Sequence, residues 1–217
     1  MIVQEGLRRM VAEQEDVFYY LTLMNENYPH PPMPEGAEEG ILKGIHRIAG
    51  DGSGDVQLLG SGTILREVEE AARLLREDWG VGADVYSVPS FTELARDGME
   101  AERWNMLHPG ETARAPYVTQ CLKDAPGVLV AASDYVKALP DSIDRWLPRR
   151  LTTLGTDGFG RSENRAGLRE FFEVDYRYVV VATLAALARE GTIDLSVVQQ
   201  AIKTHNINPD KANPATS

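Results

Sequence analysis

The chain has 217 residues, of which 33 are acidic and 22 are basic, so its formal net charge is −11 at pH 7. Proteins that bind nucleic acid or anionic membrane surfaces usually carry an excess of basic residues, and this balance argues against both classes. Cys121 is the single cysteine, which excludes an intramolecular disulfide and a cysteine-based zinc site. The first residues show neither the basic nor the apolar region of a signal peptide. We therefore expect a reducing, cytoplasmic setting.

The first 40 residues resemble the end of one structural unit followed by a linker. Apolar residues in 1–14 recur on one helix face, and residues 17–23 are continuously apolar, which predicts a strand buried on both faces. A helix and one strand cannot form a core. We therefore expect 1–24 to complete a sheet whose other strands lie outside this chain. Residues 25–40 are rich in proline, which predicts a stiff linker.

Residues 41–205 predict an α/β domain. A short amphipathic helix is expected over 41–48 and a flexible glycine turn over 50–54. Strand and helix patterns then alternate, which indicates a mostly parallel sheet with helices on both faces. The strands are expected at 56–60, 84–88, 127–132 and 150–155, and the helices at 64–79, after the capping residue Ser90, at 134–147 with a kink at Pro140, and at 163–172, 176–190 and 195–205. The polar tail 206–217 predicts partial disorder.

Two glycine motifs are candidates for binding a nucleotide or cofactor. Gly60-Ser61-Gly62 follows a strand and opens a helix, as in a dinucleotide fingerprint, but Leu65 takes the place of the third glycine. We interpret it as a tight turn, with a phosphate or nucleotide site as the alternative. Gly50-Asp51-Gly52 matches the start of a thiamine diphosphate and Mg²⁺ motif. The downstream asparagine ligands are absent from 73–90, so we interpret it as a loop.

Three further features have both a structural and a functional interpretation. His108 lies between apolar residues and a proline, and a structural or interface role is favoured over catalysis because no nucleophile or carboxylate signature accompanies it. Cys121 is expected to be a buried apolar residue on a helix. The loop Asp157–Ser162 follows the fourth strand at the carboxyl edge of the sheet. It is either a shaped turn with Ser162 as a helix cap or a loop that faces a partner.

Five segments, several of them long and of unusual composition, occur in the order found in one enzyme family. They are Asn25–Tyr28, Met33–Gly40, Phe91–Gly98, Glu102–Pro109 and Leu154–Ser162. These segments closely resemble the carboxyl-terminal part of the homodimeric bacterial pyruvate dehydrogenase E1 component, which is built like transketolase. The resemblance covers essentially the whole chain.

The resemblance implies a domain organisation and a reaction. Residues 1–24 would be the last helix and strand of the pyrimidine-binding domain, 25–40 the linker, and 41–205 a transketolase carboxyl-terminal-like domain. The complete enzyme would decarboxylate pyruvate with thiamine diphosphate and Mg²⁺ and reductively acetylate a lipoyl group on the E2 acetyltransferase. Its partners would be the rest of the E1 polypeptide, a second E1 copy and E2. This chain is expected to shape the dimer interface and the substrate channel without binding either cofactor.

One departure from related enzymes bears on the substrate. Transketolases that use sugar phosphates have an Arg-Gln-Asn-Leu-Pro type of sequence where this chain has 25–29, and their arginine grips the phosphate. Here that guanidinium is absent and Glu26 is negatively charged, which favours a substrate without phosphate. The residues that we expect at the substrate channel or an interface are Asn25, Glu26, Asn27, Tyr28, His108, Asp157 and Arg161, with anchoring of the linker as the alternative for the first four.

Two other classes of function stay open. The chain could be a non-catalytic α/β interaction or anion-binding module that uses the turn Gly60–Thr63. A nicotinamide-dependent dehydrogenase is a weaker alternative, because its fingerprint is incomplete.

Overall fold

The computed structural model of the chain describes residues 1–25, 27–29 and 31–217, and within these residues five strands form one sheet. The strands are β1 (His46–Ala49), β2 (Val56–Gly60), β3 (Ala83–Ser87), β4 (Val128–Ala132) and β5 (Leu151–Leu154). Their order is β1-β3-β2-β4-β5, with β1 antiparallel to β3 and all other neighbours parallel. The predicted class, an α/β fold with a mostly parallel sheet of about five strands, is confirmed.

The central strands β2 and β4 are buried along their whole length. Val56 and Leu58 contribute to one apolar core, whereas Leu59 contributes to a second core on the opposite face. Successive side chains of a strand point to opposite faces, so strands that are buried at every position need a helical layer on each side.

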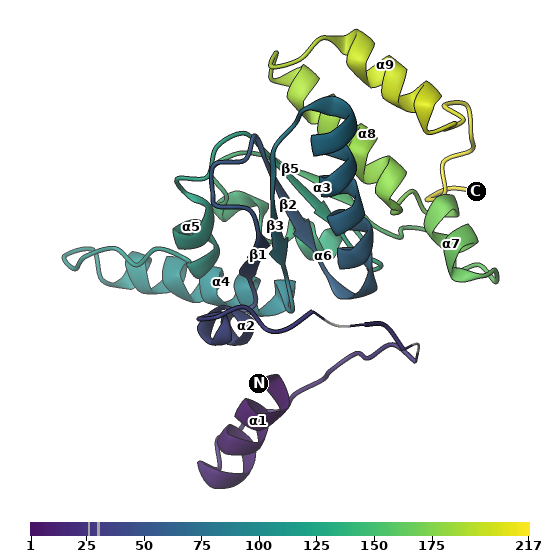
Figure 1. Cartoon of the computed structure of the whole chain (residues 1–217). Coiled ribbons are helices and arrows are strands. Elements are labelled where there is room, and N and C mark those ends of the chain that lie inside the picture. Colours follow the sequence, from purple (N-terminus) through teal and green to yellow (C-terminus); the bar gives the residue numbers. More distant parts are fainter. Residues whose placement is uncertain (26, 30) are drawn as a thin grey trace.

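Helices supply both layers. The helices α3 (Leu65–Trp79), α8 (Tyr176–Arg189) and α9 (Leu195–Thr204) pack on the first core, and α4 (Phe91–Leu107), α5 (Tyr117–Leu122) and α6 (Ala138–Asp141) on the second. Figure 1 shows α3 and α8 side by side on one face and α4 and α5 on the other. The short helix α7 (Arg165–Phe171) lies near the carboxyl terminus. No described helix has the length and apolar character needed to cross a bilayer.

The strand predicted at 17–23 is not formed within this chain, and because its expected partner strands lie outside the chain, the prediction stays a prediction. The segment is extended and makes no ladder, and the side chains of Phe18 and Leu23 are 88% and 89% exposed. Helix α1 (Ile2–Leu7), continued by a π-helical turn over Arg8–Ala12, precedes it away from the sheet (Figure 1). A strand needs a partner for its backbone groups, and the described residues offer none here.

The helix predicted at 41–48 is correct only over 41–43 and wrong beyond it. Helix α2 spans Glu38–Lys43 and ends at Gly44, whose φ of 98° reverses the chain. The following residues then pair with β3 as the antiparallel edge strand β1. Ile45 is fully buried in the second core, so tertiary packing overrides the helical spacing.

Two local predictions after β4 need correction. The helix expected over 134–147 is instead divided into the one-turn helix α6, which contains Pro140, and a 3-10 turn at Asp144–Trp146. Asn164, not Ser162, caps α7, since its Oδ1 accepts from the amide of Gly167 at 2.9 Å. Lys211 in the tail donates to the carbonyls of Glu170 and Phe171 and ties the tail to α7.

Asp84 on β3 organises the glycine loop that leads into β2. Its side chain is fully buried, and its two carboxylate oxygens accept from the amides of Gly52 at 2.7 Å and Gly54 at 2.8 Å. Gly50 has a φ of 86°, and a Cβ there would lie 2.0 Å from Asp84 Oδ1. The loop therefore closes around this carboxylate, and only glycine fits at position 50.

We expect Asp84→Asn to lower the free energy of unfolding by about 2 kcal/mol, because an amide NH₂ group would face one of the two backbone donors. Urea denaturation would measure the change. Asp124→Asn, at a side chain that is 88% exposed, is the matched control and should stay within about 0.5 kcal/mol of the parent chain. Equal effects of the two substitutions would contradict this role for Asp84.

Two histidines make stability depend on pH. Burial lowers the pKa of His46 and of His205 below the usual 6.5. Both are therefore neutral in the fold and take up a proton more readily when unfolded, so their contribution is present above pH 6.5 and is lost as the pH falls toward their folded values. We expect the free energy of unfolding to fall between pH 7.5 and pH 5.5, both pH values being about one unit from the usual pKa. His46→Phe should weaken this dependence when urea denaturation is repeated across the pH range, and an unchanged dependence would contradict the role of His46.

Candidate functional site

The carboxyl edge of the sheet contains a topological switch point between β2 and β4. The chain leaves β2 through α3 toward β3 on one side, whereas β4 and β5 lie on the other side. The registers align Gly60 with Ala132, and Ala132 with Leu154, so the loops after β2, β4 and β5 begin next to one another. Open α/β sheets place ligands outside this edge, at this point of the topology.

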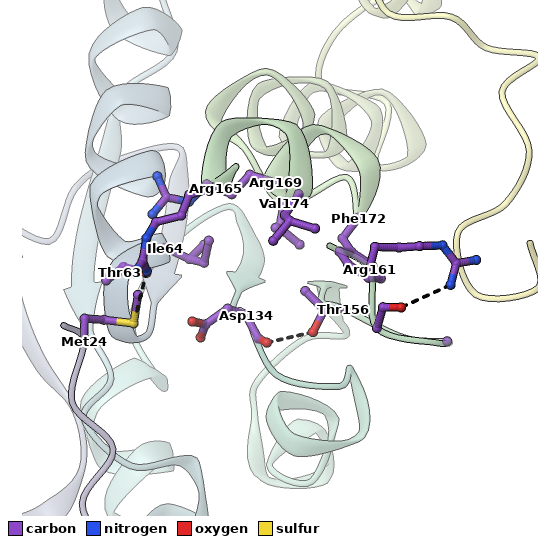
Figure 2. A pocket seen from close by; sticks show the side chains of 13 residues that line it. Met24, Thr63, Ile64, Asp134, Thr156, Arg161, Arg165, Arg169, Phe172 and Val174 are labelled. Atoms are coloured by element: carbon purple, nitrogen blue, oxygen red, sulfur yellow. Dashed lines mark hydrogen bonds between the residues drawn. The ribbon is translucent and has the colours of Figure 1, made fainter. Parts of the chain in front are cut away.

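A cavity of about 300 Å³ lies at the switch point. Figure 2 shows its walls, which come from the loops after β2, β4 and β5, from α7 and from Met24 of the linker region. Part of the lining is apolar, namely Met24, Ile64, Leu168, Phe172 and Val174. The polar lining consists of Thr63, Asp134, Thr156, Arg161, Arg165 and Arg169.

The position of Asp134 disfavours an anion at the glycine turn. A Cβ built on Gly62 would lie 3.3 Å from Asp134 Oδ1, so a carboxylate already stands beside the turn. A phosphate bound there would meet a like charge. The φ of 57° at Gly62 fits the interpretation as a tight turn. The anion-binding alternative therefore loses its proposed place at Gly60–Thr63.

The arginines of the cavity wall are engaged in different ways. Arg169 forms a half-buried ion pair with Glu67 of α3 at 2.8 Å, and Glu67 also accepts from the amide of Tyr176 at 3.1 Å. The guanidinium of Arg161 turns away from the cavity toward the tail (Figure 2), where it bonds the carbonyl of Ser217 and lies over Phe171. The ion pair joins α3 to the corner between α7 and α8, and Arg161 joins its loop to the tail.

The structure brings part of the predicted site to this edge. Asn25 Oδ1 accepts from Arg165 at 2.6 Å, and the ring of Tyr28 lies 4.3 Å from the Arg66 guanidinium. Asn27 is exposed, and Glu26 lies outside the described residues. Asp157 belongs to the same edge and accepts from the amide of Lys137 at 3.0 Å, which shapes the loop.

His108 lies elsewhere, at the end of α4, far from α7 in Figure 1. Its ring stacks on Trp104 with 4.5 Å between centroids, and its Nδ1 contacts the carbonyl of Trp104 at 2.8 Å. Arg114 covers Trp104 at 4.0 Å. This stacked column fits the structural interpretation of His108.

Asp134, Arg165 and Arg169 of the cavity wall are not among the residues predicted from the sequence. Two signals were available: Asp134 follows the third predicted strand almost directly, and Arg161, Arg165 and Arg169 recur at a spacing of four residues into a predicted helix. Such spacing places side chains on one helix face, but many exposed helices show it as well.

The described residues of this chain do not fit thiamine diphosphate with Mg²⁺. In the Gly50–Gly54 loop, Asp51 accepts from the amide of Ser53, while the amides of Gly52 and Gly54 are used by Asp84. Among the described residues, no group of three or more histidine, cysteine, aspartate or glutamate side chains could hold a metal ion. Burial raises the pKa of the Cys121 thiol, which disfavours a nucleophilic role.

Comparison with known families identifies the class. Residues 44–175 match the transketolase-like TK C-terminal domain, and residues 1–31 match the pyruvate dehydrogenase E1 component middle domain. The first match covers more than half of the chain, so the chain belongs to the transketolase-like C-terminal domain family.

Similarity to curated proteins points to one kind of enzyme within this family. The chain is 55% identical over 218 residues to the pyruvate dehydrogenase E1 component of Pseudomonas aeruginosa, which covers 99% of this chain and 25% of the relative. It is 57% identical to the protein of the same name from Escherichia coli strain K12, over 99% of this chain and 24% of the relative. The chain thus spans about a quarter of the length of these relatives. The predicted resemblance to this enzyme is confirmed.

A solved structure supports the fold. A transketolase from Pichia stipitis superposes with a TM-score of 0.51 at 17% identity, over 74% of this chain and 20% of that chain. At this identity the likeness concerns the fold alone.

We expect Glu67→Gln to lower the free energy of unfolding by about 1 to 3 kcal/mol, because it leaves the half-buried Arg169 without its charge partner. Glu70→Gln on the same helix is the control. Its pair with Arg73 is exposed and should contribute about 0.5 kcal/mol or less. Urea denaturation of both variants measures the difference. Similar losses of unfolding free energy would contradict the view that the Glu67–Arg169 ion pair joins α3 to α7.

Proposed function

We propose that this chain is part of a pyruvate dehydrogenase E1 component that decarboxylates pyruvate with thiamine diphosphate and Mg²⁺ and reductively acetylates the lipoyl group of E2. The observation that carries the proposal is the identity of 55% and 57% to two enzymes of that name over 99% of the chain. The two family matches support it further, because they follow one another along the chain as middle and carboxyl-terminal domains.

Within that enzyme we assign this chain a supporting role. Its described residues do not fit the cofactor and its metal ion, so we place their site in the rest of the E1 polypeptide and derive no chemical step here. Residues 1–24 would complete the pyrimidine-binding domain, 25–40 would form the linker, and 41–205 the carboxyl-terminal domain with its tail at 206–217.

Exposed apolar side chains indicate that residues 1–24 pack against a surface outside this chain. Phe18, Tyr20 and Leu23 are 88%, 84% and 89% exposed, and Val3, Leu7 and Val11 are also exposed. Such a concentration of apolar surface is costly unless another surface covers it. The remainder of the E1 polypeptide and a second copy in a cytoplasmic homodimer would supply that cover.

The linker sequence is an argument that the substrate carries no phosphate. Asn25 has a neutral amide side chain. Transketolases that use sugar phosphates have an arginine at the corresponding position. An amide cannot provide the charged, two-pronged grip of a guanidinium on a phosphate. Pyruvate, which carries only a carboxylate, fits this change.

We expect the complete enzyme to release CO₂ from pyruvate in a thiamine diphosphate-dependent manner and this chain alone to show no release above background. The assay follows labelled CO₂ from carboxyl-labelled pyruvate, with xylulose 5-phosphate as the control substrate that should not be used. Appreciable decarboxylation by the chain alone would contradict the division of labour. A complete enzyme that ignored pyruvate would contradict the proposed function itself.

A further inference from the structure

Part of the linker region is tied across the carboxyl edge of the sheet. We call residues Thr22–Asn25 together with Asn27–Tyr28 the strap. It has no regular secondary structure, yet it contacts three separate elements of the α/β domain. The strap is therefore placed by side chains that belong to the domain.

Arg165, the first residue of α7, makes the central contact. Its Nη2 donates to Asn25 Oδ1 at 2.6 Å, and its Nη1 lies 3.7 Å from Met24 Sδ, as the dashed line in Figure 2 marks. Met24 and Arg165 both line the cavity at the switch point. A guanidinium presents several donors in a rigid plane, so it holds two neighbouring residues in a defined geometry.

Two further contacts flank this one. The hydroxyl of Tyr135, in the loop after β4, donates to Thr22 Oγ1 at 2.7 Å. The guanidinium of Arg66 on α3 lies 4.3 Å from the centre of the Tyr28 ring. Contacts before, at and after Asn25 restrict both the position and the direction of the strap. One contact alone would leave an irregular segment free to rotate about it.

The elements that carry the side chains contacting the strap are fixed to one another by further interactions. Asn164 caps α7 immediately before Arg165, and the ion pair between Arg169 and Glu67 joins α7 to α3, which also carries Arg66. The loop of Tyr135 is joined to the loop after β5, because Thr156 donates to the carbonyl of Tyr135 at 2.9 Å. All three contacts therefore start from rigid parts of one edge of the sheet.

We infer that Arg165 is a positioning residue which, with Tyr135 and Arg66, holds Asn25 and Tyr28 in place at the mouth of the substrate channel. The inference rests on the proposed function, because the channel belongs to the complete enzyme. Arg165 would act through Asn25 and not on the substrate. The carboxyl-terminal domain would thus contribute to catalysis by placing a segment that precedes it in the chain.

Limited proteolysis of this chain tests the placement without any enzyme activity. We expect Arg165→Gln to raise the rate at which chymotrypsin cleaves after Leu23 and Met24 about tenfold, the effect of losing one charge-assisted hydrogen bond. Arg103→Gln, at an exposed arginine on α4, is the matched control and should leave this rate unchanged. Tyr135→Phe should also raise the rate. Unchanged cleavage in both test variants, with circular dichroism reporting a folded chain, would overturn the inference.

Kinetics of the complete enzyme test the function of the placement. We expect Arg165→Gln to raise KM for pyruvate about tenfold with kcat changed less than about twofold, because the chemical step takes place elsewhere. Arg165→Lys should recover part of the loss, since it keeps the charge but not the planar fork. A fall in kcat with unchanged KM, or no effect on either constant, would overturn the positioning role. If the parent enzyme does not turn over pyruvate, the proposed function fails while the proteolysis experiment still decides whether the strap is held.

Discussion

The fold depends on the burial of β2 and β4 on both faces of the sheet. Their side chains alternate between two apolar cores, one under α3 and α8 and the other under α4 and α5. Covering both faces requires the connection after β2 to run in one direction and the connection after β3 to return in the other. This reversal creates the switch point between β2 and β4 and brings three loops together at the carboxyl edge.

That edge is where related topologies bind ligands, and here the chain occupies much of it with its own residues. Asp134 lies beside the glycine turn, Arg161 bonds the tail, and Met24 of the strap lines the cavity. An edge arranged in this way suits a domain that holds neighbouring segments in place. A dinucleotide-binding edge would instead keep its turn open toward a pyrophosphate.

The candidate site was predictable only where its residues are close in sequence. Asn25 and Tyr28 were recognisable because they lie in one segment shared with a known family, and the structure places them at the carboxyl edge. Arg165 follows Asn25 by 140 residues, and no periodicity links the two. His108 is part of another recognisable segment, yet it lies at the end of α4, since adjacency in a shared pattern does not imply adjacency in space.

Composition and periodicity determined the class of the fold, four of the strands and the cap of α4 at Ser90, because these follow from local patterns of apolar and capping residues. The family was indicated separately, by the resemblance of particular segments to a known enzyme. Tertiary structure alone decided that His46–Ala49 is a strand, since its backbone pairs with β3 after Gly44 turns the chain. It also decided that 17–23 stays unpaired in this chain, and that Arg165, Tyr135 and Arg66 meet the strap. Backbone pairing and long-range contacts arise from the assembled sheet, and a helical or apolar pattern is compatible with more than one such assembly.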